Sequence, residues 1–217
     1  MMSDLGFVHR YLPGEDGSGA TLLVLHGTGG NEEDLIPLAQ DLAPGAAILS
    51  PRGKVSEYGA PRFFRRLAEG VFDHEDLLFR THELAEFVEA AAVQYGFDLS
   101  KVVAVGYSNG ANVAASTILL HPGLLRAAVL FRAMVPFEPE VTPDLSGLPV
   151  LMAAGRMDRM IPPDNTQRLA DILAEAGADV DLRWRDVSHP LTYEEVGEAR
   201  EWLTVTLPKL SGVQDNG

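Results

Sequence analysis

One serine in this sequence stands in a setting that can turn its hydroxyl into a nucleophile. Residues 106–110 read Gly-Tyr-Ser-Asn-Gly, a G-x-S-x-G pattern centred on Ser108. The pattern directly follows an apolar run at 102–105 and directly precedes a helix-compatible run, which is the context of a nucleophile elbow. Glycines at both ends of the pattern remove side chains that would collide in so tight a turn. This context favours a catalytic serine over a chance serine in an ordinary strand–loop–helix junction.

A serine hydroxyl needs a general base to take its proton. Where a G-x-S-x-G elbow carries the nucleophile, an acid and then a histidine follow it along the chain. Of the six histidines, two follow Ser108, namely His121 and His189. His121 ends the same predicted helix, roughly 20 Å from the serine at 1.5 Å per residue. His189, after the last predicted strand, is therefore the predicted base, against the alternative of a surface-loop histidine.

The acid that orients this histidine should follow a strand between the serine and the histidine. The apolar run 150–153 is followed by a short loop that ends in Asp158, which is the predicted acid. Asp164 is the competitor, but it stands beside the start of a predicted helix, and a helix cap is its simpler interpretation. Asp144 precedes the strand and is disfavoured.

A glycine-rich loop follows the apolar run 22–25, and residues 26–30 read His-Gly-Thr-Gly-Gly. Glycines in such a loop let backbone N–H groups approach a carbonyl oxygen that is becoming an oxyanion. The predicted oxyanion donors are the amides of Thr28 and of Asn109, the residue directly after the nucleophile. His26 is predicted to be structural and to tie the loop down.

Two other interpretations of these glycines fail. A dinucleotide-binding fingerprint needs a glycine at position 32, which is Glu32, and a phosphate-binding P-loop needs a Gly-Lys-Ser/Thr ending, which is absent. No histidine or carboxylate spacing indicates a metal site, and residues 74–76 with His82 are more simply a solvated helix start. The sequence therefore predicts neither a cofactor nor a metal.

Apolar runs alternate with helical patterns along the chain. Strands are predicted near 7–11 and at 22–25, 46–49, 102–105, 127–131, 150–153 and 180–184. Helices are predicted near 32–43, 76–95, 109–120, 165–176 and 192–207, with Asn165 and Thr192 as N-caps and Gly96 and Gly177 as stops. The alternation predicts an α/β fold, with a mostly parallel central sheet and helices on both faces. Active sites of such sheets lie at the carboxyl ends of the strands.

The composition bounds the class of protein. The chain has 217 residues, of which 46% are hydrophobic, and this fits one domain over 1–210 with a disordered tail at 211–217. The net charge of -14 disfavours nucleic acid and anionic membranes as partners. There is no cysteine, no apolar run long enough to cross a bilayer and no secretory signal at the acidic start, so a cytoplasmic protein is expected.

Residues 61–66 follow a predicted strand at the edge where the site is expected. Phe63 and Phe64 are interpreted equally well as the lining of an acyl or aromatic pocket and as core. Three arginines lie in the same stretch, Arg62, Arg65 and Arg66. Pairing with surface carboxylates is favoured for them over attraction of an anionic substrate. The run 131–137 is a candidate for the opposite wall, and core packing or a dimer contact explains it equally well.

On these motifs the sequence resembles the phospholipase/carboxylesterase family of α/β-hydrolases, which includes acyl-protein thioesterases. The likeness covers about 7–207 and rests on residues 26–30, 106–110, 155–158 and 188–189, while 61–67 resembles a small bacterial carboxylesterase subgroup. The resemblance implies an α/β-hydrolase fold with little or no cap domain and a cofactor-free enzyme. It also implies a small-molecule ester as substrate and frequent homodimers.

The sequence departs from the family pattern at two positions. Many members have Gln after the nucleophile, where this chain has Asn109, and the backbone donor should be unaffected. Pro190 follows the predicted base, biases His189 toward extended backbone and removes one loop N–H. The second departure leaves the geometry of the histidine loop open.

The function predicted from these residues is a serine carboxylesterase that works through an acyl-enzyme. Thioesters or lysophospholipids remain alternative substrates. A perhydrolase is disfavoured, because such enzymes tend to carry Met after the nucleophile. A non-catalytic ligand-binding protein on the same fold is the alternative from another class, and it is disfavoured because no triad member is missing.

Overall fold

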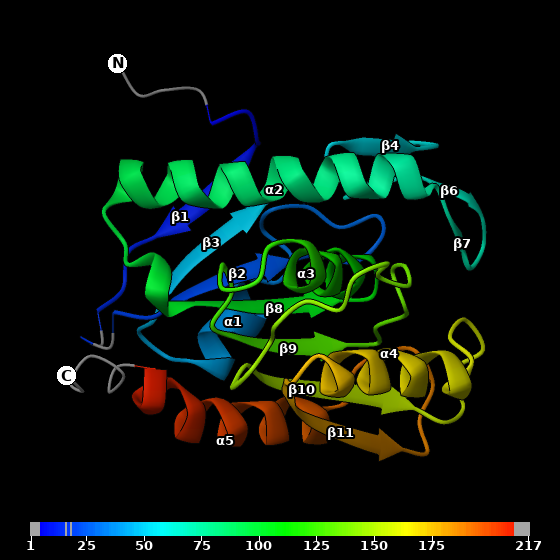
Figure 1. Cartoon of the computed structure of the whole chain (residues 1–217). Coiled ribbons are helices and arrows are strands. Elements are labelled where there is room, and N and C mark those ends of the chain that lie inside the picture. Colours follow the sequence, from blue (N-terminus) through cyan, green and yellow to red (C-terminus); the bar gives the residue numbers. More distant parts are fainter. Residues whose placement is uncertain (1–4, 16, 18, 211–217) are drawn as a thin grey trace.

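A seven-stranded sheet forms the centre of the computed structural model, which describes residues 5–15, 17 and 19–210. The strand order is β1-β3-β2-β8-β9-β10-β11 (Figure 1). The strands are β1 (His9–Leu12), β2 (Thr21–Leu25), β3 (Ala47–Pro51), β8 (Val102–Tyr107), β9 (Ala127–Phe131), β10 (Pro149–Gly155) and β11 (Asp179–Arg185). Edge strand β1 pairs antiparallel with β3, and the other pairs of this sheet are parallel. The predicted, mostly parallel sheet is confirmed.

Helices cover both faces of this sheet. The described residues form α1 (Ile36–Leu42), α2 (His74–Tyr95), α3 (Asn109–Leu120), α4 (Pro163–Glu175) and α5 (Tyr193–Leu210), with a 3-10 turn at Leu99–Lys101. Helices α2, α3 and α4 pack on one face, and α1 and α5 pack on the other (Figure 1). Two clusters of buried apolar side chains lie between the helices and the sheet, one on each face.

The central strands are buried along their whole length. Every residue of β2 and β9 is buried, and so is β8 up to its last residue. Parallel strands that are covered on both faces need apolar side chains at successive positions, which explains the continuous apolar runs. Helix α3 is also almost wholly buried, because it lies between the sheet and α2. The strand ends that carry the site therefore stand on a rigid platform.

Two short hairpins lie between β3 and α2 in the sequence. The strands are β4 (Val55–Glu57) with β5 (Ala60–Arg62), and β6 (Arg66–Ala68) with β7 (Val71–Phe72). Each hairpin turns at a glycine with positive φ, 89° at Gly59 and 72° at Gly70. They extend beyond the sheet at the carboxyl ends of its parallel strands (Figure 1). The sequence predicted only irregular chain here.

The first helix starts later than predicted, at Ile36 instead of residue 32. The residues before it form turns, in which the Asn31 side chain accepts from the Glu33 amide at 2.8 Å and the Asp34 side chain accepts from the Asn31 amide at 3.1 Å. Asn and Asp compete with a helix by such local hydrogen bonds. The prediction over 32–43 was therefore wrong in its first turn.

Asn165 is not the cap predicted for the fourth helix, because α4 begins two residues earlier, at Pro163. The Asn165 side chain instead accepts a hydrogen bond from the Val135 amide at 2.8 Å. Proline at a first helical position loses no helical hydrogen bond, so it starts the helix well. The stop predicted at Gly96 is confirmed, since this residue caps α2 in the left-handed region.

No helix within the described ranges is long and apolar enough to cross a membrane. The tail predicted at 211–217 lies outside the described residues, as do residues 1–4 at the start of the chain.

Candidate active site

Four loops meet at one edge of the sheet, each directly after a parallel strand. Thr28 follows β2, Ser108 follows β8, Asp158 follows β10 and His189 follows β11. Because parallel strands end at the same edge, these residues, distant in sequence, come together in space. This is the edge at which the sequence predicts the site.

The turn that carries Ser108 is strained. Its φ of 52° and ψ of -112° are values that residues other than glycine rarely adopt. A Cβ at Gly106 would lie 2.7 Å from the Ala111 backbone, and one at Gly110 would lie 2.0 Å from the Leu25 carbonyl oxygen. Only glycine fits at these two positions, so the G-x-S-x-G spacing follows from the close approach of β8, α3 and β2.

The three residues predicted as nucleophile, base and acid form one hydrogen-bonded chain. Nε2 of His189 lies 3.1 Å from Oγ of Ser108, and Nδ1 of His189 lies 2.7 Å from Oδ2 of Asp158. The other carboxylate oxygen of Asp158 accepts from the amides of Met160 at 2.8 Å and Ile161 at 3.3 Å. The Asp158 side chain is 1% exposed, so these contacts fix its orientation.

Two backbone amides beside Ser108 have no acceptor among the described residues. They belong to Thr28 and to Asn109, the residues predicted as oxyanion donors, and both residues line the same cleft as Ser108. Asn109 is the first residue of α3, where an N–H has no acceptor inside the helix. The positive end of the α3 dipole lies at the same place. The arrangement suits a developing negative charge on a substrate oxygen.

His26 anchors the loop that carries Thr28. Its Nδ1 donates to the Gly27 carbonyl at 2.7 Å, and its Nε2 accepts from the Gly53 amide at 2.9 Å. One neutral tautomer satisfies both bonds. Burial lowers the pKa of His26, which keeps the ring in that neutral form. His26 therefore holds this loop in place, as the sequence predicts.

Strand β5 and the residue after it hold the loop of Thr28 and helix α3 together. The Pro61 carbonyl accepts from the Gly29 amide at 2.9 Å, and the Phe63 amide donates to Oδ1 of Asn109 at 2.7 Å. The Phe63 ring itself is buried and packs on His26, with ring centroids 4.7 Å apart. This segment keeps the Thr28 and Asn109 amides at a fixed separation.

The two phenylalanines considered as pocket lining belong to the core. Phe63 is 3% and Phe64 0% exposed, and neither borders the cleft at Ser108. The apolar lining comes instead from Phe72, Met134, Met160 and Ile161. Of the run 131–137, Met134 thus contributes to the wall of the cleft.

A buried arginine that the sequence did not single out as a site residue holds the histidine loop. Arg132 is 1% exposed and has a φ of 57°. Its Nε donates to the carbonyls of Ser188 at 3.2 Å and His189 at 3.0 Å, and its Nη2 donates to the carbonyl of Pro190 at 3.1 Å. Its Nη1 donates to the Ala153 carbonyl at 3.1 Å. The guanidinium thus joins three consecutive residues of the loop to the end of β10.

Glu195 completes the set of acceptors for Arg132. Its two oxygens accept from Nη1 at 2.7 Å and from Nη2 at 2.9 Å. Glu195 also accepts from the Thr192 amide at 3.0 Å, while the Thr192 hydroxyl accepts from the Glu195 amide at 3.3 Å, a capping box at the start of α5. Burial raises the pKa of Glu195, but the bonds from Arg132 and Thr192 outweigh burial and hold it below its ordinary value.

The proline after the histidine is accommodated by these contacts. Pro190 has no N–H to give, but the loop is held through its carbonyl groups, and those need donors from elsewhere. Arg132 supplies most of them, and the Tyr107 hydroxyl adds a bond to the His189 carbonyl at 3.2 Å. The loop geometry that the sequence left open is therefore set by the last side chain of β8 and by the first side chain after β9.

The remaining histidine after Ser108 lies at the far end of its helix. His121 follows the last residue of α3, and its Nε2 is 2.9 Å from Nδ1 of His82. This pair is exposed, and Ser108 stands at the opposite end of α3. Within the described residues, no cluster of three or more His, Cys, Asp or Glu side chains is arranged to hold a metal ion.

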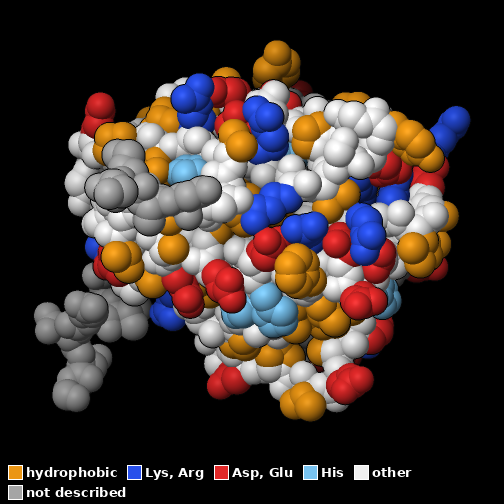
Figure 2. Space-filling model, turned by 90° about the horizontal axis from the view of Figure 1, so that it is seen from above, with side chains coloured by type: hydrophobic (Ala, Val, Ile, Leu, Met, Phe, Trp, Pro, Cys, Tyr) orange, Lys and Arg blue, Asp and Glu red, His pale blue; other side chains and the backbone are white. Residues whose placement is uncertain are grey.

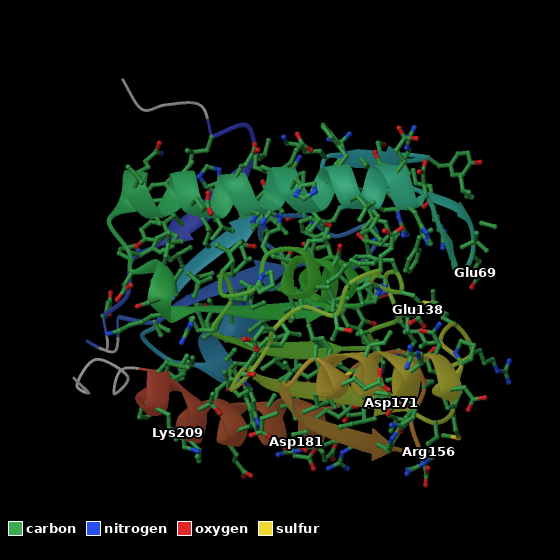
Figure 3. All side chains as sticks on the ribbon, viewed as in Figure 1. Glu69, Glu138, Arg156, Asp171, Asp181 and Lys209 are labelled. Carbon is green, nitrogen blue, oxygen red and sulfur yellow. The ribbon has the colours of Figure 1, made fainter. Side chains whose placement is uncertain are left out.

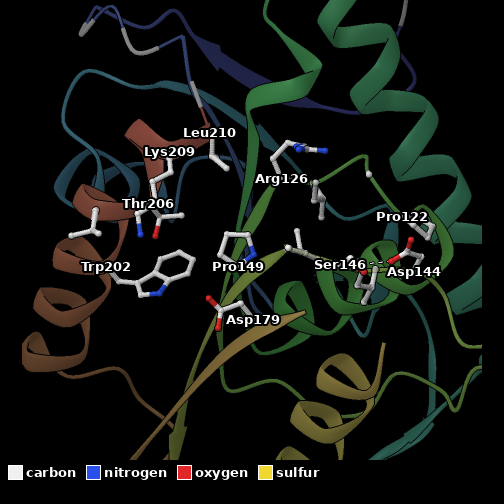
Figure 4. A pocket seen from close by; sticks show the side chains of 16 residues that line it. Pro122, Arg126, Asp144, Ser146, Pro149, Asp179, Trp202, Thr206, Lys209 and Leu210 are labelled. Atoms are coloured by element: carbon white, nitrogen blue, oxygen red, sulfur yellow. Dashed lines mark hydrogen bonds between the residues drawn. The ribbon is translucent and has the colours of Figure 1, made fainter. Parts of the chain in front are cut away.

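The cleft at Ser108 is small, with a cavity of about 40 Å³. A larger hollow of about 580 Å³ lies at the opposite edge, beside the residues that begin β10 and β11, Pro149 and Asp179 (Figure 4). Trp202 and Lys209 of α5 border it as well. It is larger than the cleft at Ser108, but no serine–histidine pair among the described residues borders it. The smaller cleft is therefore the candidate site.

Known proteins resemble this chain over most of its length. The sequence model described as Phospholipase/Carboxylesterase matches residues 66–207. The "Putative hydrolase MhqD" of Bacillus subtilis (strain 168) is 46% identical over 181 residues, which cover 83% of this chain and 90% of that protein.

Solved structures agree with this match. The carboxylesterase of Bacillus cereus has 47% identity and a TM-score of 0.89, covering 91% of this chain and 93% of that one. YahD, solved with malic acid, has 34% identity and a TM-score of 0.86, covering 91% of this chain and 98% of that one. The fold is the α/β-hydrolase fold, and this chain belongs to the phospholipase/carboxylesterase family.

Proposed function

We propose that this chain is a serine carboxylesterase that hydrolyses small carboxylic esters through an acyl-enzyme. The observation that carries the proposal is the chain of hydrogen bonds from Asp158 through His189 to Ser108, beside the two open amides of Thr28 and Asn109. A nucleophile, its base, an orienting acid and an oxyanion site are the parts that acyl transfer needs.

In the proposed first step, Ser108 Oγ attacks the ester carbonyl carbon while Nε2 of His189 takes its proton. The carbonyl oxygen becomes an oxyanion, and the amides of Thr28 and Asn109 donate to it. Asp158 stabilises the imidazolium and keeps Nδ1 protonated. His189 then gives the proton to the leaving alcohol oxygen. Water repeats these steps on the acyl-serine and releases the acid.

The cleft favours small substrates. Its cavity is only about 40 Å³, and the exposed Met160 at its border can move. Malic acid, with which the relative YahD was solved, is a small carboxylic acid and supports the same size class. Thioesters with small acyl groups would fit the same chemistry.

The test is Ser108→Ala assayed with p-nitrophenyl acetate and p-nitrophenyl butyrate. We expect kcat/KM to fall at least about a thousandfold while the fold is kept, because the variant lacks the nucleophile. Ser100→Ala is the matched control, since this exposed serine contacts Asp98 far from the cleft. Full activity of Ser108→Ala would refute the proposal. A fluorophosphonate probe should label the wild type and not the variant, whereas a ligand-binding protein without catalysis would not be labelled.

A further inference from the structure

Arg62 is a charged residue in the wall of the proposed active-site cleft, and no step of the proposed hydrolysis uses it. Its side chain is only 4% exposed, although it borders the cleft together with Ser108. Its Nε donates to the Phe64 carbonyl at 3.2 Å, and its Nη1 donates to Oγ1 of Thr28 at 2.6 Å. The Nη end of the guanidinium therefore points toward the oxyanion loop.

One end of this guanidinium is left without a partner. Nη2 of Arg62 has no acceptor among the described residues, and it is not one of the enclosed side-chain atoms that lack a partner, so it keeps accessible surface. Thr28, which holds the neighbouring Nη1, also borders the cleft. An arginine has five N–H donors in a planar fork that matches a carboxylate. Nη2 is thus an unused donor of a residue that borders both the cleft and a neighbouring hollow of about 480 Å³ lined by β4, β5 and β6.

The charges around Arg62 leave a positive surplus. Arg66 borders the same cleft and donates to both oxygens of Glu57, at 2.9 and 3.1 Å. The same carboxylate lies 3.4 Å from Nε of Arg62, so one anion faces two guanidiniums. Burial, and then the charge of Arg66, lower the pKa of Arg62. Glu69 also borders the cleft, but it is exposed at the tip of the β6–β7 hairpin (Figure 3).

Other arginines of the molecule are balanced differently. On the face seen in Figure 2, Lys and Arg side chains lie beside Asp and Glu side chains. Arg65, three residues from Arg62, is 62% exposed and lies 3.2 Å from Asp73 and 3.5 Å from Asp76. Arg62 differs because it is buried and borders the cleft. This locally positive site, in a chain of net charge -14, is suited to bind an anionic ligand.

We propose that Arg62, with Arg66 beside it, binds a carboxylate of the substrate, so that the preferred substrates are small esters that also carry a free carboxylate. The proposal rests on the esterase function proposed above and narrows its substrate class. Charge-assisted hydrogen bonds to a carboxylate are strong enough to select such a substrate over its neutral counterpart.

The experiment compares matched esters that differ only in charge. One pair is the mono-p-nitrophenyl ester of glutaric acid and its methyl-capped diester, with uncatalysed rates subtracted. The other is 4-acetoxybenzoate and its methyl ester, which place the carboxylate on the alcohol side. We expect kcat/KM of the wild type to favour the charged ester at least about tenfold in one pair. Equal rates, or a preference for the neutral ester in both pairs, would overturn the proposal.

Substitutions of the arginines test whether Arg62 causes the preference for charged esters. Arg62→Gln should abolish the preference, mainly by raising KM for the charged ester, and Arg62→Lys should restore part of it because the charge returns. Arg66→Gln should weaken the preference and serves as the second variant if Arg62→Gln fails to fold. Arg65→Gln is the matched control and should leave the preference unchanged. A preference that survives both Arg62→Gln and Arg66→Gln contradicts the assignment.

A binding measurement separates this proposal from the esterase proposal. Monomethyl glutarate should bind Ser108→Ala more tightly than dimethyl glutarate does by calorimetry, and Arg62→Gln in the same background should remove the difference. Hydrolysis of neutral esters without any charge preference would leave the esterase function standing and sink the carboxylate site. Failure of the wild type to hydrolyse any ester, together with selective binding of the monoester, would refute the esterase function and leave the carboxylate site standing.

Discussion

Two buried arginines flank the proposed active site, and they are satisfied to different degrees. Arg132 donates to carbonyl groups of the histidine loop and of β10 and to both oxygens of Glu195, so each of its five N–H groups has an acceptor. Arg62 has acceptors at Nε and Nη1 and shares Glu57 with Arg66. A guanidinium with all donors paired fixes structure, whereas one with an open donor facing a cleft can bind a ligand.

The comparison also separates two kinds of cost. Removal of one partner from a buried ion pair leaves an uncompensated charge inside the protein, which is strongly destabilising. Removal of a charge that already lacks full compensation destabilises the protein less. The native protein already carries part of the desolvation penalty of that charge, and the substitution removes this penalty. Arg132, behind the histidine loop, should therefore govern stability, and Arg62, in the wall of the cleft, should govern selectivity.

The largest effect is expected from Arg132→Met. It leaves Glu195 buried without its cation, so the free energy of unfolding should fall by about 3–5 kcal/mol. Urea unfolding at pH 7 measures this loss. In the folded fraction, kcat for a neutral ester should fall more than KM rises, because the histidine loop loses its donors. An equal loss of stability in Arg62→Gln would break the comparison between the two arginines.

Glu195→Gln should show the next largest effect, and its size should depend on pH. The pKa of Glu195 is lowered in the folded protein, so the ion pair contributes its full stability above the pKa of an unfolded glutamate. That contribution is lost as the pH falls through the lowered, folded-state pKa. The difference in unfolding free energy between wild type and variant should therefore be largest near pH 7 and shrink in acid. A difference that stays constant from pH 7 to pH 3 would contradict this origin.

Tyr107→Phe should have a smaller effect on the same loop. It removes one hydroxyl that donates to the His189 carbonyl, while the bond from Arg132 to that carbonyl remains. We expect a loss of about 1 kcal/mol in unfolding free energy and a few-fold lower kcat. Stopped-flow or steady-state assays with p-nitrophenyl acetate measure the second quantity. A loss as large as that of Arg132→Met would show that the tyrosine, and not the arginine, holds the loop.

Arg200→Gln should have the smallest effect. Arg200 pairs with Asp41 at 2.7 Å, but both side chains are about half exposed, so water and salt screen the interaction. The change in unfolding free energy should stay within about 0.5 kcal/mol, and ester kinetics should be unaltered. A clear loss of stability here would mean that charge pairs contribute in this protein whether or not they are buried.

Much of the fold was predictable because its strands are buried on both faces. Continuous apolar runs mark β2, β8 and β9 at nearly their observed positions. The hairpins formed by β4 to β7 were missed, because strands of two or three residues, some of them partly exposed, leave no alternating pattern. Side chains that bond to nearby amides, such as Asn31, shifted the start of α1 in a way that periodicity does not record.

The candidate site was predictable where one local rule or the chain order sufficed. The glycine spacing marked Ser108, and order along the chain with elimination selected His189 and Asp158, which the structure brings within hydrogen-bond distance. Their catalytic roles remain predictions. Arg132 was not assigned to the site because its partners lie far along the chain, up to Glu195. A charged residue directly after a fully buried strand was the signal that could have identified it.

Glu195 caps α5 and also neutralises the charge of Arg132. These two roles have a consequence for biosynthesis. The ribosome makes the chain from its amino end, so the elbow with Ser108 emerges long before the last helix does. A chain truncated before α5 contains the serine and even its histidine, but Arg132 then has no counter-charge and the histidine loop has no firm support. The proposed nucleophile should therefore be inactive on nascent or prematurely terminated chains, and the proposed hydrolysis should begin only once synthesis is nearly complete.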